Sequence, residues 1–306
     1  MLQKEFPTLK SFKLPSYNIK YAKKGFFFRI KILLQIPFII SAISKEKIVV
    51  KKLIEKENIN GIISDNRIGV LSKKIPSVYI THQLNVLSGL TTYISSKIHQ
   101  KFIHQFDECW VPDLENEPNF SGKLGHLKTQ HSKVKYIGIL SRFKKQQLPV
   151  KYDLMVVLSG PEPQRTLLEN KLLMELKRYK GMVLFVRGVL LNKARIEAPS
   201  NFEIKDYLLS KELEKALNQS NVIISRSGYT TVMDLAALGK KAFFIPTPGQ
   251  LEQEYLAKKL HKNLIAPFAI QDRFTANNLN ELKNFSGFEA CKTTFDLNFF
   301  KLFKSE

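Results

Sequence analysis

The sequence predicts an α/β protein made of two domains, each with a buried parallel sheet. Short apolar runs, typical of strands covered on both faces, alternate with stretches of helical periodicity. A charged, proline-containing stretch at residues 142–151 interrupts this alternation, which then restarts. A chain of 306 residues is also long enough for about two domains. We therefore expect a first domain at 1–148, a second at 149–290 and a C-terminal tail at 291–306.

Residues 26–56 form the first element of the first domain. The run from Phe26 to Pro37 mixes aromatic, aliphatic and basic residues, which is typical of a segment at a membrane interface. An ordinary helix packed on a sheet has the same composition, and the sequence leaves both interpretations open. From Glu46 to Lys56 a Lys- and Glu-rich helical period predicts such an ordinary helix.

Four short apolar runs follow, and each suits a buried parallel strand. They end in polar or turn residues, and ligands bind at these carboxyl ends in open α/β sheets. The four runs are Ile59–Ser64, Ser77–Thr81, Glu108–Val111 and Val134–Ile139.

The second domain continues the alternation of strands and helices. Its predicted strands are Leu154–Leu158, Met182–Val186, Val222–Ser225 and Ala242–Ile245. Its predicted helices are Gln164–Lys177, Ser210–Asn218 and Thr230–Leu238, and a Pro/Gly turn at 246–249 leads into one more helix.

Charge is the most unusual feature of the composition. The formal net charge is +21, and residues 1–150 contribute +15 of it, with 25 Lys or Arg against 10 Asp or Glu. Such an excess indicates a phosphorylated substrate, an anionic membrane surface or nucleic acid, unless it is only scattered surface lysine. Nucleic acid is the least favoured partner, because the basic residues lack interleaved aromatic residues and any known reader motif.

The cysteine content and the absence of targeting signals indicate a cytoplasmic protein. Cys109 and Cys291 lie far apart and belong to no CxxC or Cys/His cluster, which predicts two reduced thiols. No run reaches the roughly 18 apolar residues of a membrane span, and residues 1–7 contain no signal-peptide core. We expect no metal and no bound cofactor, and a peripheral position on the inner face of the cytoplasmic membrane if the basic residues bind lipid.

Two strand-to-helix loops of the second domain have the composition of phosphate-binding loops. Ser159–Thr166 contains Gly160, which lets the backbone approach a ligand closely, and prolines at a helix start. Ser225–Tyr229 is a similar loop one βα unit later. At either helix N-terminus a diphosphate gains N–H and dipole stabilisation, and Arg165 adds a fork of donors. Either loop alone is a weak signal, because many α/β loops contain such residues.

Asp234 lies on the second turn of the helix that follows the Ser225–Tyr229 loop. A carboxylate there can accept both hydroxyls of a ribose, although it could instead only complement the helix dipole. At the next turn Gly249, Glu252 and Gln253 could contact sugar hydroxyls, or they could be solvated residues at a helix start.

Together these residues resemble the donor domain of the GT-B glycosyltransferases of family 28. The resemblance rests on Ser225-Arg226-Ser227-Gly228, Asp234, Pro246-Thr247-Pro248-Gly249 and Glu252-Gln253, and it covers about residues 59–265. It implies two Rossmann-like domains, with Asp234 on the ribose and Gln253 on the donor sugar. It also implies that residues 243–246 meet the uracil through backbone and that residues 159–166 face the diphosphate. The family usually has Glu at the position of Asp234. The expected donor-binding residues are Ser159, Gly160, Gln164, Arg165, Arg187, Ser225, Arg226, Ser227, Gly228, Tyr229, Thr230, Asp234, Phe244, Gly249, Glu252 and Gln253.

The first domain resembles the same family between residues 76 and 91. His82 and Asn85 match the family pattern, whereas Gln83 replaces a glutamate. The resemblance places this segment on the acceptor side, where His82 could act as a general base, bind the acceptor, or be an ordinary loop histidine.

Asp65 is a second candidate for the catalytic base. It follows a predicted strand and is the only strand-end carboxylate that the sequence of this half indicates, although it could instead cap a turn. The other expected acceptor-side residues are Asn66, Arg67 and Asn85.

One family feature is missing from the sequence. The family opens with a strand and a Gly-rich loop that often carries the catalytic histidine, and neither G-x-G-x-x-G nor G-G-x-G-H occurs here. We therefore expect the first domain to lack its opening strand–loop–helix unit. The expected function is inverting, metal-independent transfer from a UDP-sugar to a lipid-linked or phosphorylated acceptor. A nucleotide-sugar hydrolase or epimerase on the same fold and a silent donor-binding remnant are the alternatives.

Overall fold

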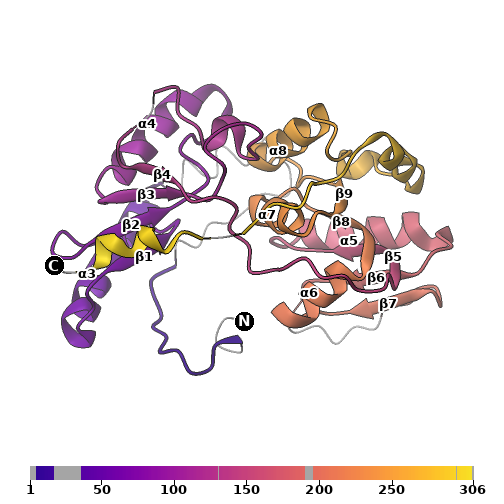
Figure 1. Ribbon diagram of the computed structural model, residues 1–306, viewed down its shortest axis with the longest axis horizontal. Helices are drawn as coiled ribbons and strands as arrows, with labels where there is room; N and C mark the ends of the chain where they lie inside the picture. The colour runs from indigo at the N-terminus through magenta and orange to yellow at the C-terminus, as the bar shows by residue number, and fades with distance from the viewer. Residues whose placement is uncertain (1–4, 17–35, 130, 190–195, 294, 305–306) are drawn as a thin grey trace. The chain divides into compact units, whose positions relative to one another are not determined.

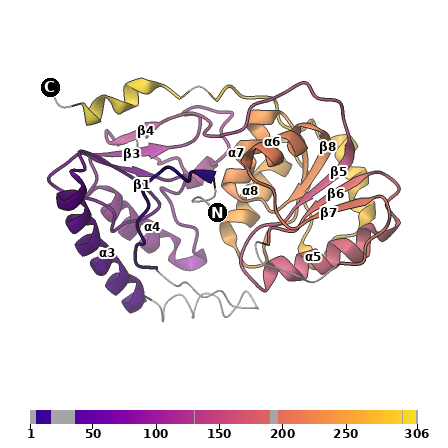
Figure 2. The ribbon, with the colours of Figure 1, turned by 90° about the horizontal axis from the view of Figure 1, so that it is seen from below.

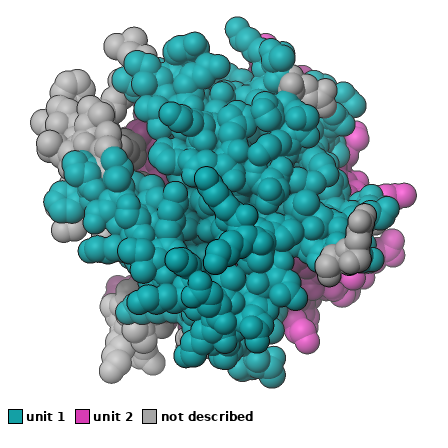
Figure 3. All heavy atoms as spheres, turned by 90° about the vertical axis from the view of Figure 1, so that its left-hand side faces the viewer, with its two compact units in different colours: residues 1–140, 294–306 teal, residues 141–293 magenta. Residues whose placement is uncertain are grey.

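The computed structural model describes residues 5–16, 36–129, 131–189, 196–293 and 295–304. The chain divides into two compact units, distinguished by colour in Figure 3: unit 1 comprises residues 1–140 and 294–306, and unit 2 comprises residues 141–293. Each unit is built on one parallel sheet with helices beside it (Figure 1). The predicted α/β class with two parallel-sheet domains is therefore confirmed.

Unit 1 contains four parallel strands in the order β1–β2–β3–β4. Each strand overlaps one of the predicted apolar runs, and Tyr79 of the second strand pairs with Cys109 of the third. The strands are β1 (Ile62–Asp65), β2 (Ser77–Ile80), β3 (Glu108–Val111) and β4 (Val134–Tyr136).

Helices α3 (Ile36–Glu57) and α4 (Thr92–Ile103) belong to unit 1. The predicted helix at residues 46–56 lies within α3, whereas residues 26–35 of the suggested membrane segment lie outside the described residues. The buried Glu46 ties α3 to the loop after β1, because its carboxylate accepts hydrogen bonds from Arg67 and from the backbone N–H of Gly69.

The C-terminal residues return to unit 1 and do not form a separate tail. They include the 3₁₀ helix η6 (Leu297–Phe303), which Figure 2 shows on the opposite side of the sheet from α3 and α4. The buried ring of Trp110 is surrounded, at centroid distances of 5.6 to 6.3 Å, by Phe295, Phe299, Phe300 and Phe303. Burying these aromatic rings against the sheet stabilises this position of the C-terminus.

Unit 2 contains five parallel strands in the order β7–β6–β5–β8–β9. The strands are β5 (Tyr152–Val157), β6 (Val183–Val186), β7 (Phe202–Lys205), β8 (Ser220–Ser225) and β9 (Lys241–Phe244). The helices are α5 (Gln164–Glu175), α6 (Ser210–Asn218), α7 (Tyr229–Leu238) and α8 (Leu251–Lys262). Strand side chains such as Val156 and Phe185 form a buried core with Leu168 and Leu172 of α5.

Strand β7 is not predicted from the sequence. It lies at the edge of the sheet, where Phe202 and Ile204 are only half-buried and alternate with charged residues. It therefore lacks the continuous apolar run that identifies a strand covered on both faces.

Unit 2 begins earlier than the predicted domain boundary at residue 148. Phe143 is buried within it, and the backbone N–H groups of Lys144 and Gln146 donate to Glu214 and Asn218. The charged composition of residues 142–151 suggests a linker, but the segment packs on unit 2.

Candidate functional site

The order of strands in unit 2 reverses between β5 and β8. The chain proceeds from β5 to β6 and β7 on one side, and from β8 to β9 on the other. In open α/β sheets such a switch point marks a crevice at the carboxyl ends of the strands. Val157 pairs with Ser225 there, so the two predicted phosphate loops leave the sheet side by side. A Cβ added at Gly160 or Gly228 would meet no atom within 4 Å, which leaves space for a ligand next to the backbone.

The helix N-termini after these two loops differ in charge. At α5 the Glu162 carboxylate accepts a hydrogen bond from the backbone N–H of Thr166 at 3.2 Å, so an anion is already present. At α7 the N-cap residue is Gly228, which has no side chain to cap the helix. Glu162 therefore partly neutralises the positive end of the helix dipole at α5, whereas the N-cap residue of α7 adds no charge.

Two serines lie beneath the N-terminus of α7. The hydroxyl of Ser225 is buried and has no hydrogen-bond partner among the described residues. The hydroxyl of Ser227 donates to the carbonyl oxygen of Gln253 at 2.8 Å, which joins this loop to α8. A buried hydroxyl without a partner is unusual in a folded protein and marks a place where a polar ligand atom would be stabilised.

Arg226 points into unit 2 and not into solvent. Its Nη1 donates to the carbonyl oxygens of Ile245 and Pro246, and its Nη2 donates to the Gln164 carbonyl oxygen and to Oε1 of Gln271. Burial lowers the pKa of its guanidinium to about 10. The side chain is a buried cation that joins the loop after β8 to the start of α5, the end of β9 and Gln271. It can act on a ligand only through the electric field of its charge.

Arg165 and Arg187 form a buried ion network with Glu169. Glu169 accepts hydrogen bonds from both guanidinium groups, Arg165 also bonds Glu162, and Arg187 also bonds Asp206 at 2.8 Å. The expected role of Arg165 as a fork on the diphosphate does not match this geometry, because its donors are directed at protein oxygens. The network fixes the loops after β5, β6 and β7 relative to one another.

Asp234 is half-buried on α7, as its spacing predicts. Burial raises the pKa of its carboxyl to about 6, although a hydrogen bond from Ser141 and the charge of Arg142 act in the opposite direction. Oδ1 accepts the hydrogen bond from the Ser141 hydroxyl at 2.6 Å. The sequence interpretation missed both residues: Arg142 begins the stretch expected to be a linker, and Ser141 directly precedes it.

The expected contact of residues 243–246 with uracil through backbone is not supported. The N–H of Phe244 donates to the carbonyl oxygen of Pro267, and the N–H of Ile245 donates to that of Ser225. The Phe244 carbonyl oxygen accepts from Ala269, and the side chain is fully buried. These groups are used in the sheet and in its contact with the following chain, so Phe244 is a core residue.

The turn before α8 is held by its own side chains. Gln253 Oε1 accepts from the N–H of Thr247, and Glu254, not Glu252, accepts from the N–H of Gly249. Of the other expected residues, Ser159, Gly160 and Thr230 are exposed, Gln164 and Tyr229 are buried, and Glu252 is half-buried at the start of α8.

The expected acceptor-side residues follow β1 and β2 in unit 1. Asp65 and Asn66 are exposed, and Arg67 bonds the buried Glu46. His82 is half-buried. Asn85 is a structural residue, because its amide bonds the carbonyl oxygens of residues 123 and 126 and the side chain of Gln100.

Asp65 is not the only strand-end carboxylate of unit 1. Asp113 follows β3, but it is fully buried and accepts hydrogen bonds from three backbone N–H groups and from the hydroxyl of Ser121. A fully buried carboxylate held by all these donors shapes its loop and is not accessible to an acceptor hydroxyl, so Asp65 and His82 stay the candidates.

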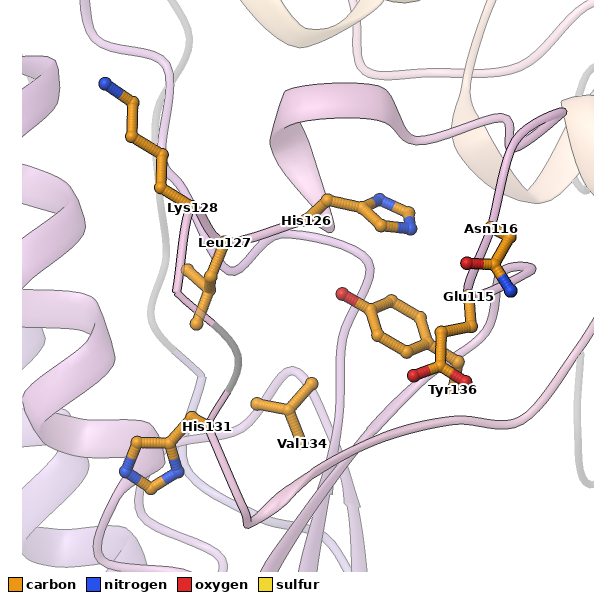
Figure 4. Close-up of a pocket in the computed structure, with 8 residues that line it drawn as sticks. All are labelled: Glu115, Asn116, His126, Leu127, Lys128, His131, Val134 and Tyr136. Carbon is orange, nitrogen blue, oxygen red and sulfur yellow. The ribbon is translucent and has the colours of Figure 1, made fainter.

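A pocket of about 250 Å³ lies beside β4 in unit 1, as Figure 4 shows. The ring of His126 stacks on Tyr136 there, and its two nitrogens lie 3.0 Å from the carbonyl oxygens of Gly122 and Leu114. None of the expected acceptor-side residues is among the eight that line it.

Neither a metal cluster nor a membrane-spanning helix is found in the described part of the chain. No three His, Cys, Asp or Glu side chains of those residues are placed to hold a metal ion. No described helix combines the length and apolar character needed to cross a bilayer.

Residues 164–284, which lie within unit 2, match the glycosyltransferase family 28 C-terminal domain. Unit 2 contains a family 28 C-terminal domain. The family 28 domain includes α5, β8, α7 and α8, and therefore both helix N-termini and Asp234.

Two curated relatives extend the similarity beyond the family 28 domain. Both are named UDP-N-acetylglucosamine–N-acetylmuramyl-(pentapeptide) pyrophosphoryl-undecaprenol N-acetylglucosamine transferase. The protein from Buchnera aphidicola subsp. Schizaphis graminum is 29% identical over 225 residues, or 70% of this chain. The one from Haemophilus ducreyi is 24% identical over 219 residues, or 69% of this chain. In both cases the match spans 58% of the relative's length.

Solved structures of glycosyltransferases have the same fold. The kitacinnamycin glycosyltransferase has a TM-score of 0.60 at 12% identity, covering 82% of this chain and 73% of the other. The MurG protein of Acinetobacter baumannii has a TM-score of 0.51 at 17% identity, covering 92% and 76%. The likeness confirms the predicted GT-B architecture of the chain that carries the family 28 domain.

Proposed function

We propose that this protein transfers a sugar from a UDP-sugar to a lipid-linked acceptor. The observation that carries the proposal is the site in the family 28 domain, where the N-terminus of α7, which begins after Gly228, and the carboxylate of Asp234 lie on one helix at the switch point of the sheet. The names of the curated relatives support UDP-N-acetylglucosamine as the donor and a pyrophosphoryl-undecaprenol sugar as the acceptor.

The donor diphosphate binds at α7 in this proposal and not at α5. The N–H groups at the start of α7 and its dipole stabilise the leaving diphosphate, whereas Glu162 repels it from α5. Arg226 adds a buried positive charge on the protein side of the crevice. Asp234 accepts the ribose hydroxyls.

The acceptor binds to unit 1 in this proposal. Its hydroxyl, deprotonated by His82 or Asp65, attacks the anomeric carbon in line with the leaving diphosphate, and the configuration at that carbon inverts. The exposed position of Asp65 and the half-buried position of His82 leave both accessible to a ligand in unit 1.

A transfer assay tests the proposal directly. The full chain is incubated with UDP-N-acetylglucosamine and a short-chain lipid-linked muramyl-pentapeptide acceptor, and the expected result is release of UDP that depends on the acceptor. Release of free sugar without acceptor would indicate a hydrolase, and UDP binding without turnover would indicate a silent remnant. Changing the true base to alanine should lower the rate about 10²- to 10⁴-fold. Asp272→Ala, on an exposed residue of unit 2, is the control.

Unit 1 offers a surface for an anionic membrane, on which we place the acceptor. On α4, Tyr93, Ile94 and Ile98 have exposed fractions of 74%, 61% and 54%, and the exposed Lys97 and Lys101 lie on the same helix. Apolar residues flanked by lysine favour a peripheral position at the cytoplasmic face, where anionic lipids attract basic residues.

Sedimentation with vesicles tests this surface. Lys97→Glu with Lys101→Glu should weaken binding to anionic vesicles, because each lysine near such a surface contributes about 1 kcal/mol at low salt. High salt should have the same effect on the wild type. Lys258→Glu with Lys262→Glu on α8 provides a charge-matched control. Equal binding of all variants to anionic vesicles would contradict the assignment to α4.

A further inference from the structure

The first residue of unit 2 contacts the carboxylate of Asp234. The Ser141 hydroxyl donates to Oδ1 of Asp234 at 2.6 Å and accepts from the backbone N–H of Phe143 at 3.1 Å. Because the N–H of Phe143 uses a lone pair of the hydroxyl oxygen, the hydroxyl hydrogen is directed at the carboxylate. Ser141 therefore holds one of the two carboxylate oxygens in a fixed position.

The segment that carries Ser141 is anchored firmly on unit 2. The side chain of Phe143 is 2% exposed, and the Lys144 N–H donates to Glu214 at 2.6 Å. Asn218 accepts from the N–H of Gln146 and donates to the carbonyl oxygen of Lys144. These contacts fix the backbone on the side of Ser141 that leads into unit 2, so its hydroxyl is presented to Asp234 by a rigid support.

The electrostatic surroundings of Asp234 make this contact important for a ligand. Burial favours the protonated carboxyl, and the Ser141 hydrogen bond and the charge of Arg142 favour the carboxylate. Ribose hydroxyls donate best to an ionised and correctly oriented carboxylate.

We propose that Ser141 is a positioning residue of the donor site, which holds Oδ1 of Asp234 so that the carboxylate faces the two ribose hydroxyls. This inference rests on the proposed function, in which Asp234 binds the ribose. It adds a residue that lies outside the family 28 match at 164–284 and that acts on the ligand through Asp234 alone.

The test compares ligands with and without ribose hydroxyls. UDP and 2′,3′-dideoxy-UDP are titrated calorimetrically into the full-length wild type, Ser141→Ala and Ser141→Thr. Loss of one hydrogen bond to a charged group should weaken UDP binding by Ser141→Ala about 10-fold. The dideoxy ligand should bind wild type and Ser141→Ala equally, and Ser141→Thr should restore UDP binding. Ser286→Ala, which removes an exposed hydroxyl elsewhere in unit 2, should change neither affinity.

Each other outcome is decisive. An unchanged affinity of Ser141→Ala for UDP overturns the inference, and so does an equal loss for both ligands, because the residue would then act on the fold. If Asp234→Ala also leaves UDP affinity unchanged, the ribose assignment fails. If the wild type does not bind UDP, the proposed function fails together with the inference.

Discussion

Replacing Asp234 by alanine is expected to weaken UDP binding about 100-fold while the protein stays folded. A carboxylate that accepts two ribose hydroxyls contributes a few kcal/mol to binding, and the half-buried site excludes much of the water that would replace it. Isothermal titration of wild type and variant at pH 8 measures the difference. Equal affinities would remove Asp234 from the site.

The pKa of Asp234, raised by burial to about 6, adds a pH dependence to this prediction. UDP favours the carboxylate, so the advantage of wild type over Asp234→Asn should be full above about pH 6 and should disappear as the pH falls below it. Comparing wild type with Asp234→Asn at each pH cancels the effect of the UDP phosphate, which titrates in the same pH range.

Folding should show the opposite dependence. Because the folded pKa lies above the ordinary value of 3.8, the stabilisation from this carboxyl is complete below pH 3.8 and is lost as the pH rises through about 6. Asp234→Asn should therefore melt at a higher temperature than wild type at pH 8. A residue that stabilises a ligand at the expense of the fold is typical of a binding site.

Replacing Arg226 by methionine is expected to lower the free energy of unfolding of unit 2 by about 3 kcal/mol or more. The change leaves the buried carbonyl oxygens of Ile245 and Pro246 without their donor, and each such loss costs about 1–3 kcal/mol. Arg226→Lys should retain part of the stability, because an ammonium group keeps the charge but lacks the planar fork. Urea unfolding of the three proteins measures the effect.

Arg273→Met provides the matched control for Arg226. Arg273 is exposed on the 3₁₀ helix η4 (Gln271–Arg273), two residues from the Gln271 that Arg226 bonds. The control should unfold like wild type. If Arg226→Met kept full stability and lost only UDP affinity, Arg226 would contact the ligand directly, contrary to the buried geometry described here.

The sequence predicts the elements whose apolar residues follow a clear strand or helix pattern. Helix α6 and strand β3 have the predicted ends, because continuous apolar runs and clear helical periods translate directly into buried faces. Helix α4 is not predicted, since its apolar residues Tyr93, Ile94 and Ile98 face solvent and break the usual amphipathic pattern. Strand β7 is also not predicted, because an edge strand is only half-buried and lacks a continuous apolar run.

The sequence predicts where the candidate site residues lie along the chain. It does not predict which way their side chains point. The loops after β5 and β8 and the place of Asp234 follow from the βα spacing. Whether an arginine faces a ligand depends on carboxylates that are distant in sequence. Arg187 bonds Glu169 on α5 and Asp206 in the loop after β7. Because both partners are distant in sequence, the inward direction of Arg187 cannot be inferred from its own segment.

Hydrogen exchange with and without UDP, measured on the full chain, tests whether the diphosphate binds at the N-terminus of α7. Saturating UDP is expected to protect the backbone amides at residues 228–231 in α7 more strongly than those at 164–167 in α5, because the Glu162 carboxylate already bonds the N-terminus of α5. Protection confined to residues 164–167, or none in unit 2 at saturating UDP, would contradict this assignment.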